Sequence, residues 1–550
     1  MSKFSMVRVG AIRGTTGFAV FAMSAFGSAF TADAAPGVQI DGQLRTVTVR
    51  TARLAATFRD GMVVAVTNLS TGEVHADAAV ADEAGIPSGL GHVTGMPEAV
   101  GNLHSPWGTH PLSQQADPRA SYPTMHRPHA GSVWTTADIE GGVQMTWTGL
   151  SNGKQTFPEE TLAIAAWTDP KTGALLFRAT GSSPAGGVYG VQAPVANLHP
   201  EHRVYVASFG GNLYDCHETP GLRTLGGTPF WEAPVVAVEG RQGSLGLWVE
   251  APACPPDFFF LNWSGKSFSV AIEHLNLMPF EPQKSVESVT WRLDAFDGGW
   301  VAAMTPYRDW YARAFAEELR ARAAVKWAGR IKVIIDEYEK GDPAGLRALA
   351  TVFDPETVLL HEWNARAPEF DRELPDWTPR AGYAERVKAA QSLGFHTMAY
   401  VNTYCVNYNS PVFVRDRIGD FGLTRRMSLY RYATSSQDLM TFDKAKDNQL
   451  LYLDPLSARW RQYHTDMMIK WREETGTDAN YEDVGGCVGD FGNGVIEGKA
   501  AAQGSVEQFR ELLLRNPTVP MAAEYGPHSI AFAVRWPLRY QQVWGGDATR

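Results

Sequence analysis

Two carboxylates near the C-terminal end of the chain could carry out nucleophilic and acid–base chemistry. Residues 478–484 and 519–524 have the composition of two strands, with a helix-like segment at 505–515 between them, and the strands end in Asp483 and Glu524. A parallel βα architecture brings the C-terminal ends of its strands to one face, where catalytic sites form. Two carboxylates on neighbouring strand ends are the groups that glycoside hydrolysis requires. The alternative is that both groups are solvated or cap the helices that follow.

The spacing of neighbouring strands predicts which form of hydrolysis the pair supports. Retaining enzymes hold the two carboxyl groups ~5–5.5 Å apart, whereas inverting enzymes separate them by ~6.5–9.5 Å to admit a water. Adjacent parallel strands lie ~4.8 Å apart, so we expect ~5–6 Å between Asp483 and Glu524 and a retaining mechanism. Alternation along the strand puts Tyr481 and Asp483 on one face and Glu482 on the other. A shift of one residue would make Glu482 the inward carboxylate instead.

Polar and aromatic residues at the other strand ends are candidates for substrate binding. Carboxylates and amides can hydrogen-bond to vicinal sugar hydroxyls, and flat aromatic faces can stack on the C–H faces of sugars. The alternative roles of these residues are helix capping and core packing. The glycine-rich loop at 485–494 lacks the spacing of a phosphate-binding loop, so we expect it to shape the substrate site. The predicted substrate-binding residues are Asp336, His361, Glu362, Trp363, Asn402, Tyr404, Cys487 and Tyr525.

Composition and cysteine usage exclude several other classes of protein. The formal net charge of −10 argues against a nucleic-acid partner, because such proteins present a basic face. No Cys-x-x-Cys and no His-Glu-x-x-His motif occurs, so we predict no metal site and no cofactor. Of the four cysteines, Cys216 and Cys254 could pair in an oxidising compartment, or both could be buried free thiols.

The N-terminus has the three-part pattern of a secretory signal peptide. Lys3, Arg8 and Arg13 precede an apolar run at 17–30, and Ala32-Asp33-Ala34 is a small-x-small cleavage pattern. We therefore expect residues 1–34 to be a signal peptide and the mature protein to be secreted or periplasmic. The apolar run is too short to span a bilayer, and no later stretch is long and apolar enough.

The first half of the chain has the pattern of an all-β domain. Short alternating runs such as 44–49, 62–66 and 143–147 recur between Gly, Pro, Asn and Asp turns. We predict a multidomain chain with an N-terminal antiparallel β-supersandwich at 35–300. A linker helix is expected at 301–328, with Thr305 as its N-cap and Pro306 in its first turn. The loop-rich part at 85–128 would be a functional loop or an insertion.

After the linker helix, strands and helices alternate, which is typical of a parallel sheet. The expected strands are 331–335, 357–363, 395–401, 478–484 and 519–524, and residues 530–544 are expected to form the helix after the fifth strand. An eight-fold barrel needs three further units. We therefore predict that residues 329–550 form a TIM-type α/β barrel that is C-terminally truncated, with one edge of its fifth strand unpaired. The alternative is a complete but open or unusual α/β domain.

Several motifs together resemble a group of secreted glycoside hydrolases. They are Tyr-Arg-Asp-Trp at 307–310, His-Glu-Trp-Asn at 361–364, Leu-Asp-Pro at 453–455, the strand ending in Asp483 with its glycine-rich loop, and Ala-Glu-Tyr-Gly at 523–526. The group joins a galactose-mutarotase-like supersandwich to a TIM barrel and includes the endo-α-N-acetylgalactosaminidases. The resemblance implies that Asp483 is the nucleophile and Glu524 the acid/base. Glu482 departs from the pattern, which has an apolar residue at this position.

Two functional hypotheses follow from these observations. The first is an exported retaining glycoside hydrolase that acts on α-linked galactose or N-acetylgalactosamine in an oligosaccharide, polysaccharide or glycoprotein glycan. The second is a non-catalytic carbohydrate-binding or scaffold protein on a degenerate barrel. A sugar lyase or epimerase is a third alternative, because fold alone does not decide among these chemistries. The first hypothesis requires Asp483 and Glu524 to point into one pocket.

Overall fold

Short runs of alternating buried and exposed residues form the strands of the first half of the chain. In β2, for example, the side chains of Val47 and Val49 are buried while their neighbours Thr46 and Thr48 are partly exposed.

The computed structural model describes residues 36–80, 88–92, 124–208, 210–215, 221–225, 231–255, 257–263, 266–277, 280, 282–336, 343–423, 441–445, 448–486, 488 and 498–538. The strands before residue 300 are β1 (Gly37–Asp41), β2 (Thr46–Arg50), β3 (Leu54–Arg59), β4 (Met62–Asn68), β5 (Val74–Ala76), β6 (Gly89–His92), β7 (Thr124–His126), β8 (Val133–Ile139), β9 (Gly142–Ser151), β10 (Thr156–Thr168), β11 (Leu175–Ser182), β12 (Val188–Gln192), β13 (Val195–Leu198), β14 (Arg203–Ser208), β15 (Asn212–Asp215), β16 (Gly221–Leu225), β17 (Trp231–Glu239), β18 (Ser244–Val249), β19 (Asp257–Trp263), β20 (Phe268–Leu275), β21 (Ser285–Glu287) and β22 (Trp291–Phe296).

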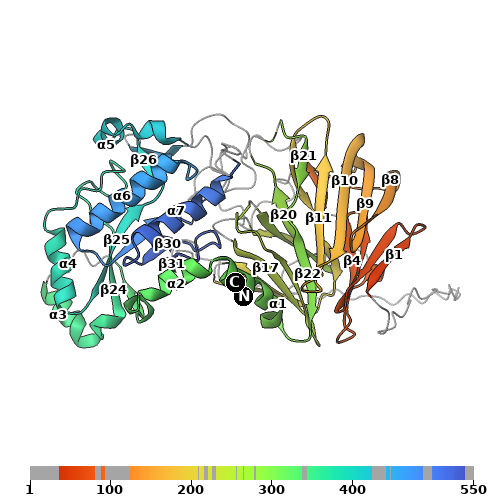
Figure 1. The fold of residues 1–550 in the computed structure, drawn as a ribbon, viewed down its shortest axis with the longest axis horizontal. Coiled ribbons are helices and arrows are strands. Elements are labelled where there is room, and N and C mark those ends of the chain that lie inside the picture. Colours follow the sequence, from red (N-terminus) through yellow and green to blue (C-terminus); the bar gives the residue numbers. More distant parts are fainter. Residues whose placement is uncertain are drawn as a thin grey trace, which may run out of the picture. The chain divides into compact units, whose positions relative to one another are not determined.

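These strands build two mostly antiparallel sheets that share one core (Figure 1). A 12-stranded sheet runs β1-β2-β3-β4-β5-β13-β20-β12-β6-β7, with β19 and β16 branching from β20, and a 10-stranded sheet runs β15-β14-β17-β18-β22-β11-β10-β9-β8, with β21 on β11. Phe58 of the first sheet meets Phe177 of the second edge-on at 5.8 Å, and Phe177 meets Trp291 at 5.4 Å. The predicted β-sandwich architecture is therefore present.

The helix that follows the sandwich begins before Thr305, its predicted N-cap. It comprises α1 (Trp300–Ala314) and α2 (Ala316–Ala324), and it breaks at Phe315. The backbone N–H of Trp300 donates to a carboxylate oxygen of Glu239 on β17, so the first turn is capped from a distant strand. The prediction of Thr305 as N-cap is wrong: Thr305 lies inside α1, and its hydroxyl donates to the carbonyl of Val301.

The second half of the chain contains a six-stranded parallel sheet in the order β23-β24-β25-β29-β30-β31 (Figure 1). Helices α6 and α7 lie side by side and α4 packs on β25 and α6. The elements after residue 324 are β23 (Val333–Ile335), α3 (Pro343–Val352), β24 (Val358–Glu362), α4 (Tyr383–Ser392), β25 (His396–Asn402), β26 (Cys405–Asn407), α5 (Pro411–Arg415), β27 (Thr441–Ala445), β28 (Asn448–Tyr452), α6 (Ala458–Thr475), β29 (Ala479–Asp483), α7 (Ala501–Arg515), β30 (Met521–Glu524) and β31 (Val534–Leu538).

Helix α6 illustrates how the sequence sets the ends of an element. The hydroxyl of Ser457 accepts a hydrogen bond from the backbone N–H of Trp460, which caps the first turn. The helix ends at Gly476, whose φ of 73° is in the left-handed region that glycine adopts without a steric cost. Trp460, His464 and Met468 recur at helical spacing on the buried face. This face positions His464 against the parallel sheet.

The last strand replaces a predicted helix. Residues 530–544 were expected to be helical, but residues 534–538 form β31, which pairs in parallel with β30. Pro537 would break a helix at this position, because it has no N–H and its ring clashes with the preceding turn, whereas an edge strand accepts it. The edge of β30 that we expected to be unpaired is therefore covered. Between β25 and α6, β26, β28 and β27 form a small antiparallel sheet.

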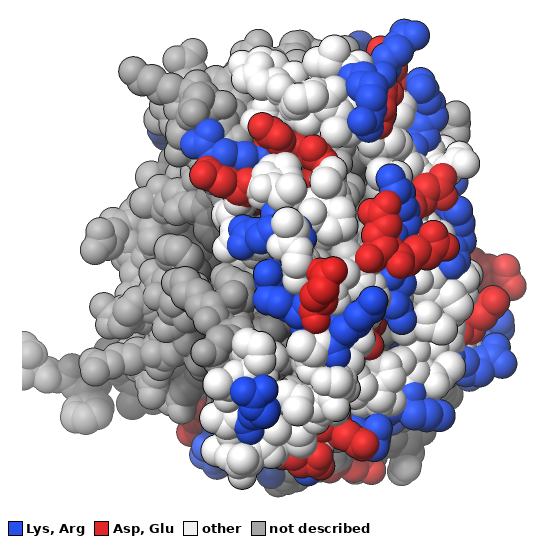
Figure 2. Space-filling model, turned by 90° about the vertical axis from the view of Figure 1, so that its left-hand side faces the viewer, with Lys and Arg blue, Asp and Glu red and all other residues white. Residues whose placement is uncertain are grey.

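Several expectations fall partly or wholly outside the described residues. The predicted signal peptide at 1–34 and Cys216 lie outside them, and Cys254 is a buried free thiol. In the loop-rich part at 85–128, β6 and β7 are described and pair with each other. Among the described residues, no helix has the length and apolar character needed to cross a membrane. On the face shown in Figure 2, acidic and basic side chains are interspersed over the described surface.

Helix α1 supports the segment that follows β30. The Tyr311 hydroxyl donates to the backbone carbonyl of His528 at 2.7 Å, and the Tyr307 hydroxyl lies 3.2 Å from Nδ1 of the same residue. Phe315 stacks on Phe532 at 4.8 Å. These contacts fix the segment that begins directly after Glu524 and Tyr525.

Tyr311→Phe should lower the stability of the chain measurably. Removing the hydroxyl leaves the His528 carbonyl without this part-buried donor, and loss of such a hydrogen bond costs roughly 0.5–1.5 kcal/mol. The urea midpoint, followed by tryptophan fluorescence, should fall. Tyr408→Phe changes an exposed tyrosine and serves as the control. An unchanged midpoint for Tyr311→Phe would contradict the supporting role of α1.

Candidate active site

Parallel register brings polar side chains together at the C-terminal ends of the central strands. Asn402 on β25 is paired with Asp483 on β29, and Glu482 on β29 with Ala523 on β30, so Asp483 and Glu524 end adjacent strands at the same level. Ala522 packs in one cluster with Tyr400 and Tyr481. Because side chains two residues apart share a face, Glu524 lies on the face of Ala522, which is also the face of Asp483.

Three donor groups lie within hydrogen-bond distance of Asp483. Its Oδ2 lies 2.9 Å from the Tyr400 hydroxyl and accepts from Nδ2 of Asn402 at 3.1 Å, and its Oδ1 accepts from the Tyr481 hydroxyl at 3.3 Å. The side-chain oxygen of Asn402 accepts from the backbone N–H of Cys405 at 2.8 Å, which turns its amide nitrogen towards Asp483. Donors to a carboxylate form strong, charge-assisted bonds. The contacts therefore fix the orientation of this carboxyl group.

Tyr400 links Asp483 to a second buried carboxylate, Asp371. Its hydroxyl lies within hydrogen-bond distance of both groups but carries one proton, so it can donate to only one of them at a time. Burial, reinforced by the nearby charges of Asp371 and Asp483, raises the pKa of Tyr400 well above its ordinary value. The hydroxyl therefore stays protonated as a donor between two carboxylates.

The loop between β24 and α4 delivers Asp371, and a buried arginine holds that loop. Arg366 donates to the backbone carbonyls of Glu369, Arg372 and Asp376, and its guanidinium lies over the Trp377 ring at 5.2 Å. Burial lowers the pKa of Arg366, while the nearby Tyr400 and Asp371 act in the opposite direction. Sequence reasoning missed both Tyr400 and Asp371. Tyr400 could have been found, because it lies two residues before Asn402 on the same face of β25. Asp371 could not, because the sequence of its loop has no periodicity or motif that predicts where its side chains lie.

Glu482 lies on the opposite side of the sheet from Asp483. Its Oε2 is 3.1 Å from Nε2 of His464 on α6 and accepts from the Thr403 hydroxyl at 3.2 Å. Both carboxylates are buried, but only Asp483 belongs to the strand-end cluster of Tyr400 and Asn402. The alternation predicted from the sequence therefore agrees with the contacts of these two residues.

Asp336, His361 and Trp363 form a second group on the same edge of the sheet. Asp336 accepts from Nε1 of Trp363 at 2.6 Å and from Nδ1 of His361 at 2.8 Å, and its side chain is 52% exposed. The Trp363 ring lies 5.3 Å from Tyr400 and 5.6 Å from Phe370, which is exposed. This arrangement presents an open carboxylate beside an aromatic surface.

Two of the predicted substrate-binding residues face the helices instead. Glu362 is fully buried and forms an ion pair with Arg386 on α4. Tyr404 is also buried, and its hydroxyl donates to Ser505 on α7 at 3.2 Å. These contacts give both residues a structural explanation, so we leave them out of the proposed site. Cys487 lies outside the described residues.

The backbone bends sharply after each of the two strand-end carboxylates. Val484 and Tyr525, which follow Asp483 and Glu524, have φ values of 51° and 60°. This region is unfavourable for residues with a side chain, and most of all for β-branched ones. Such strain persists only where surrounding contacts impose it, and it clusters at functional sites.

Gly486 allows the two strand ends to approach each other. Its backbone N–H donates to the carbonyl of Glu524 at 3.1 Å, and a Cβ atom at this position would lie 2.2 Å from that oxygen. A side chain would therefore push apart the segments that carry Asp483 and Glu524. Gly486 is part of the glycine-rich loop that the sequence predicted to shape the site.

Comparisons with known proteins place this site in a recognisable fold. Residues 287–488 match a family described as a domain of unknown function, DUF6259; the match includes Asp483 and ends before Glu524. No protein of curated function matches the chain in sequence. The α-N-acetylgalactosaminidase NagBb from Bifidobacterium bifidum, in its GalNAc complex, aligns with a TM-score of 0.60 at 13% identity, covering 93% of this chain and 79% of that chain. A quadruple mutant of NagBb gives 0.62 at 12% identity, covering 92% and 82%. The likeness establishes a shared fold.

Gly486→Ala should separate the two strand ends without unfolding the chain. The added methyl cannot fit against the Glu524 carbonyl, so one segment must move. A displacement of about 1 Å at a catalytic group can cost on the order of 10²-fold in rate. For the function proposed below, the measurement is the rate of hydrolysis of an aryl α-glycoside, with circular dichroism to check the fold. Gly42→Ala, where the new methyl meets nothing, is the control. Full activity of Gly486→Ala would show that this close approach is dispensable.

Proposed function

We propose that this chain is a retaining glycoside hydrolase that acts on glycans with α-linked galactose or N-acetylgalactosamine. The observation that carries the proposal is the hydrogen-bonded Asp483 at the end of β29, beside Glu524 at the end of the adjacent parallel strand. Paired carboxylates on strand ends are the equipment of this reaction. The choice of sugar is supported by the structural similarity to an α-N-acetylgalactosaminidase.

In the proposed mechanism, Asp483 is the nucleophile and Glu524 the acid/base. Oδ2 of Asp483 lies against Tyr400 and Asn402 at 2.9 and 3.1 Å, whereas Oδ1 has the longer contact of 3.3 Å with Tyr481, so we assign the attack on the anomeric carbon to Oδ1. The bond to the leaving oxygen breaks as Glu524 donates its proton to that oxygen, and a glycosyl ester forms on Asp483. Glu524 then takes a proton from a water that attacks the anomeric carbon, which releases Asp483 and the sugar with its configuration retained.

The second group on this edge would bind the sugar. Asp336 is open to solvent and fixed by Trp363 and His361, which suits it to accept hydrogen bonds from sugar hydroxyls. Trp363 and Phe370 offer an aromatic surface beside it, on which a sugar ring could stack. Tyr525, which follows Glu524, is partly buried and packs against the hydrophobic core around the parallel sheet.

Substitution of the two carboxylates tests the proposal directly. Asp483→Asn should abolish turnover of aryl α-galactoside and aryl α-N-acetylgalactosaminide, because an amide cannot form the glycosyl ester. Glu524→Gln should reduce hydrolysis of natural glycosides far more than that of activated aryl glycosides, which need little protonation. Asp466→Asn, an exposed change on α6, is the control.

Other outcomes of this experiment would redirect the assignment. If Asp483→Asn keeps full activity while Glu482→Gln loses it, the nucleophile is Glu482. If the wild-type chain binds these sugars but turns over neither glycoside, the carbohydrate-binding alternative replaces the enzyme. Proton NMR of the first product released would distinguish retention from inversion, and an inverted product would contradict the proposed nucleophile.

Tyr400→Phe should weaken catalysis through its effect on Asp483. The substitution removes a donor to a charged group, worth about 1.5–3 kcal/mol, which corresponds to roughly a 10- to 100-fold fall in kcat. Tyr463→Phe removes another Tyr–Asp hydrogen bond, to Asp416, away from the site and should leave kcat unchanged. Equal kcat values for Tyr400→Phe and wild type would mean that this hydrogen bond does not orient the nucleophile.

A further inference from the structure

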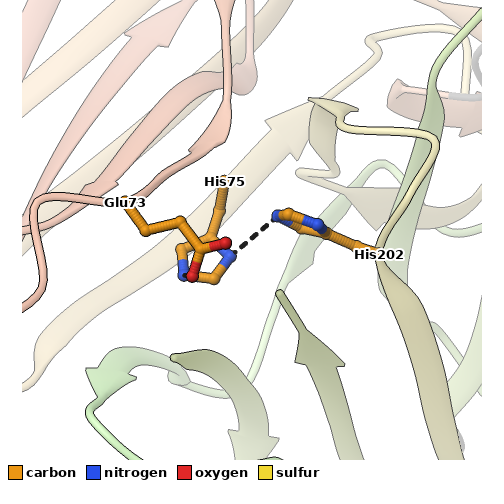
Figure 3. A group of neighbouring side chains, drawn as sticks. All are labelled: Glu73, His75 and His202. Atoms are coloured by element: carbon orange, nitrogen blue, oxygen red, sulfur yellow. Dashed lines mark hydrogen bonds and ion pairs between the residues drawn. The ribbon is translucent and has the colours of Figure 1, made fainter. Parts of the chain in front are cut away.

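Three side chains in the sandwich converge from segments far apart in the sequence. Glu73 and His75 lie at β5, and His202 lies directly before β14 (Figure 3). Nδ1 of His75 is 3.0 Å from Nε2 of His202, and Oε2 of Glu73 is 3.6 Å from Nε2 of His75. One ligand atom from each residue can be chosen so that all lie within 4.8 Å of one another.

We propose that Glu73, His75 and His202 bind a divalent transition-metal ion of the zinc class. Two imidazoles and one carboxylate are a ligand set that zinc accepts, with a further coordination position left for another ligand. Imidazole nitrogens favour Zn²⁺, Cu²⁺ or Ni²⁺ over Mg²⁺ or Ca²⁺, which prefer oxygen ligands. The site is separate from the strand-end carboxylates and belongs to a different part of the fold.

Two buried ring nitrogens in this group are available to a ligand. His75 is 0% and His202 5% exposed, and they share one contact between their rings. Nε2 of His75 and Nδ1 of His202 are buried and have no hydrogen-bond partner among the described residues. Leaving a buried polar atom unpaired costs roughly 1–3 kcal/mol. An ion bound by one nitrogen of each ring would compensate this cost.

The surrounding backbone holds the ligands in place. Oε1 and Oε2 of Glu73 accept from the N–H groups of Arg241 and Gln242 at 2.7 and 3.0 Å. Gly240 permits this, because a Cβ atom there would lie 2.4 Å from Oε1 of Glu73. The backbone N–H of His199 donates to the carbonyl of His75, and that of His202 to the carbonyl of His199. Such outer contacts orient metal ligands and tune affinity.

The position of the three ligands indicates what the ion would do. Strand β5, which contains His75 and directly follows Glu73, belongs to the 12-stranded sheet, whereas β14, which His202 precedes, belongs to the 10-stranded sheet. An ion bound by all three would cross-link the two sheets of the sandwich. Its role would be structural, and binding to the folded chain alone would raise stability by mass action.

Metal titration of the purified full chain tests the proposal. After treatment with EDTA and dialysis, calorimetric titration with ZnCl₂ should show one site per chain, and Zn²⁺ should raise the thermal midpoint. Co²⁺ should give the visible d–d bands of a low-symmetry site with nitrogen and oxygen ligands. His75→Gln and His202→Gln should lose the stoichiometric site and the thermal shift. His396→Gln, a histidine of the parallel sheet, should keep both.

Gly240→Ala tests the site without removing a ligand. The new methyl would displace Glu73, and loss of such a supporting contact typically lowers metal affinity about 10- to 100-fold. This variant keeps the proposal testable if the histidine variants fold poorly. Absence of a 1:1 site in the wild-type chain, or equal affinity in wild type and Gly240→Ala, would overturn the proposal.

Discussion

The pleat of β29 separates two carboxylates that are neighbours in the sequence. Asp483 points to the face where Tyr400 and Asn402 donate to it, while Glu482 points to α6 and His464. The parallel pairing of Tyr400 with Tyr481 and of Asn402 with Asp483 fixes this arrangement, because a slip of one residue would exchange the two faces. The identity of the candidate nucleophile therefore depends on strand register more than on any single contact.

The sequence predicted the alternation of strands and helices well because apolar periodicity is a local signal. The predicted strands 357–363, 395–401 and 478–484 agree with β24, β25 and β29 to within one residue at each end. The misses are non-local. Residues 534–538 form a strand because β30 offers an edge to pair with, and α1 begins at Trp300 because Glu239 of a distant strand caps it.

Sequence reasoning treats all residues of a strand end alike, but the structure distinguishes them. His361 and Glu362 are adjacent, yet His361 contacts Asp336, whereas Glu362 forms an ion pair with Arg386 on the helix side. Asp371 was beyond sequence reasoning, because its position depends on a loop that the buried guanidinium of Arg366 pins through three backbone carbonyls. Long-range tertiary contacts, rather than residue type, decide which polar side chains meet.

The left-handed backbone at Val484 has a consequence for protein engineering. Glycine at this position would relieve a strained conformation that typically costs about 1–3 kcal/mol. The valine side chain, however, is buried in the core that includes α7, so its removal would leave a cavity. The two effects oppose each other within one residue of Asp483. Attempts to make the chain more heat-resistant should therefore start in the sandwich and leave this turn unchanged.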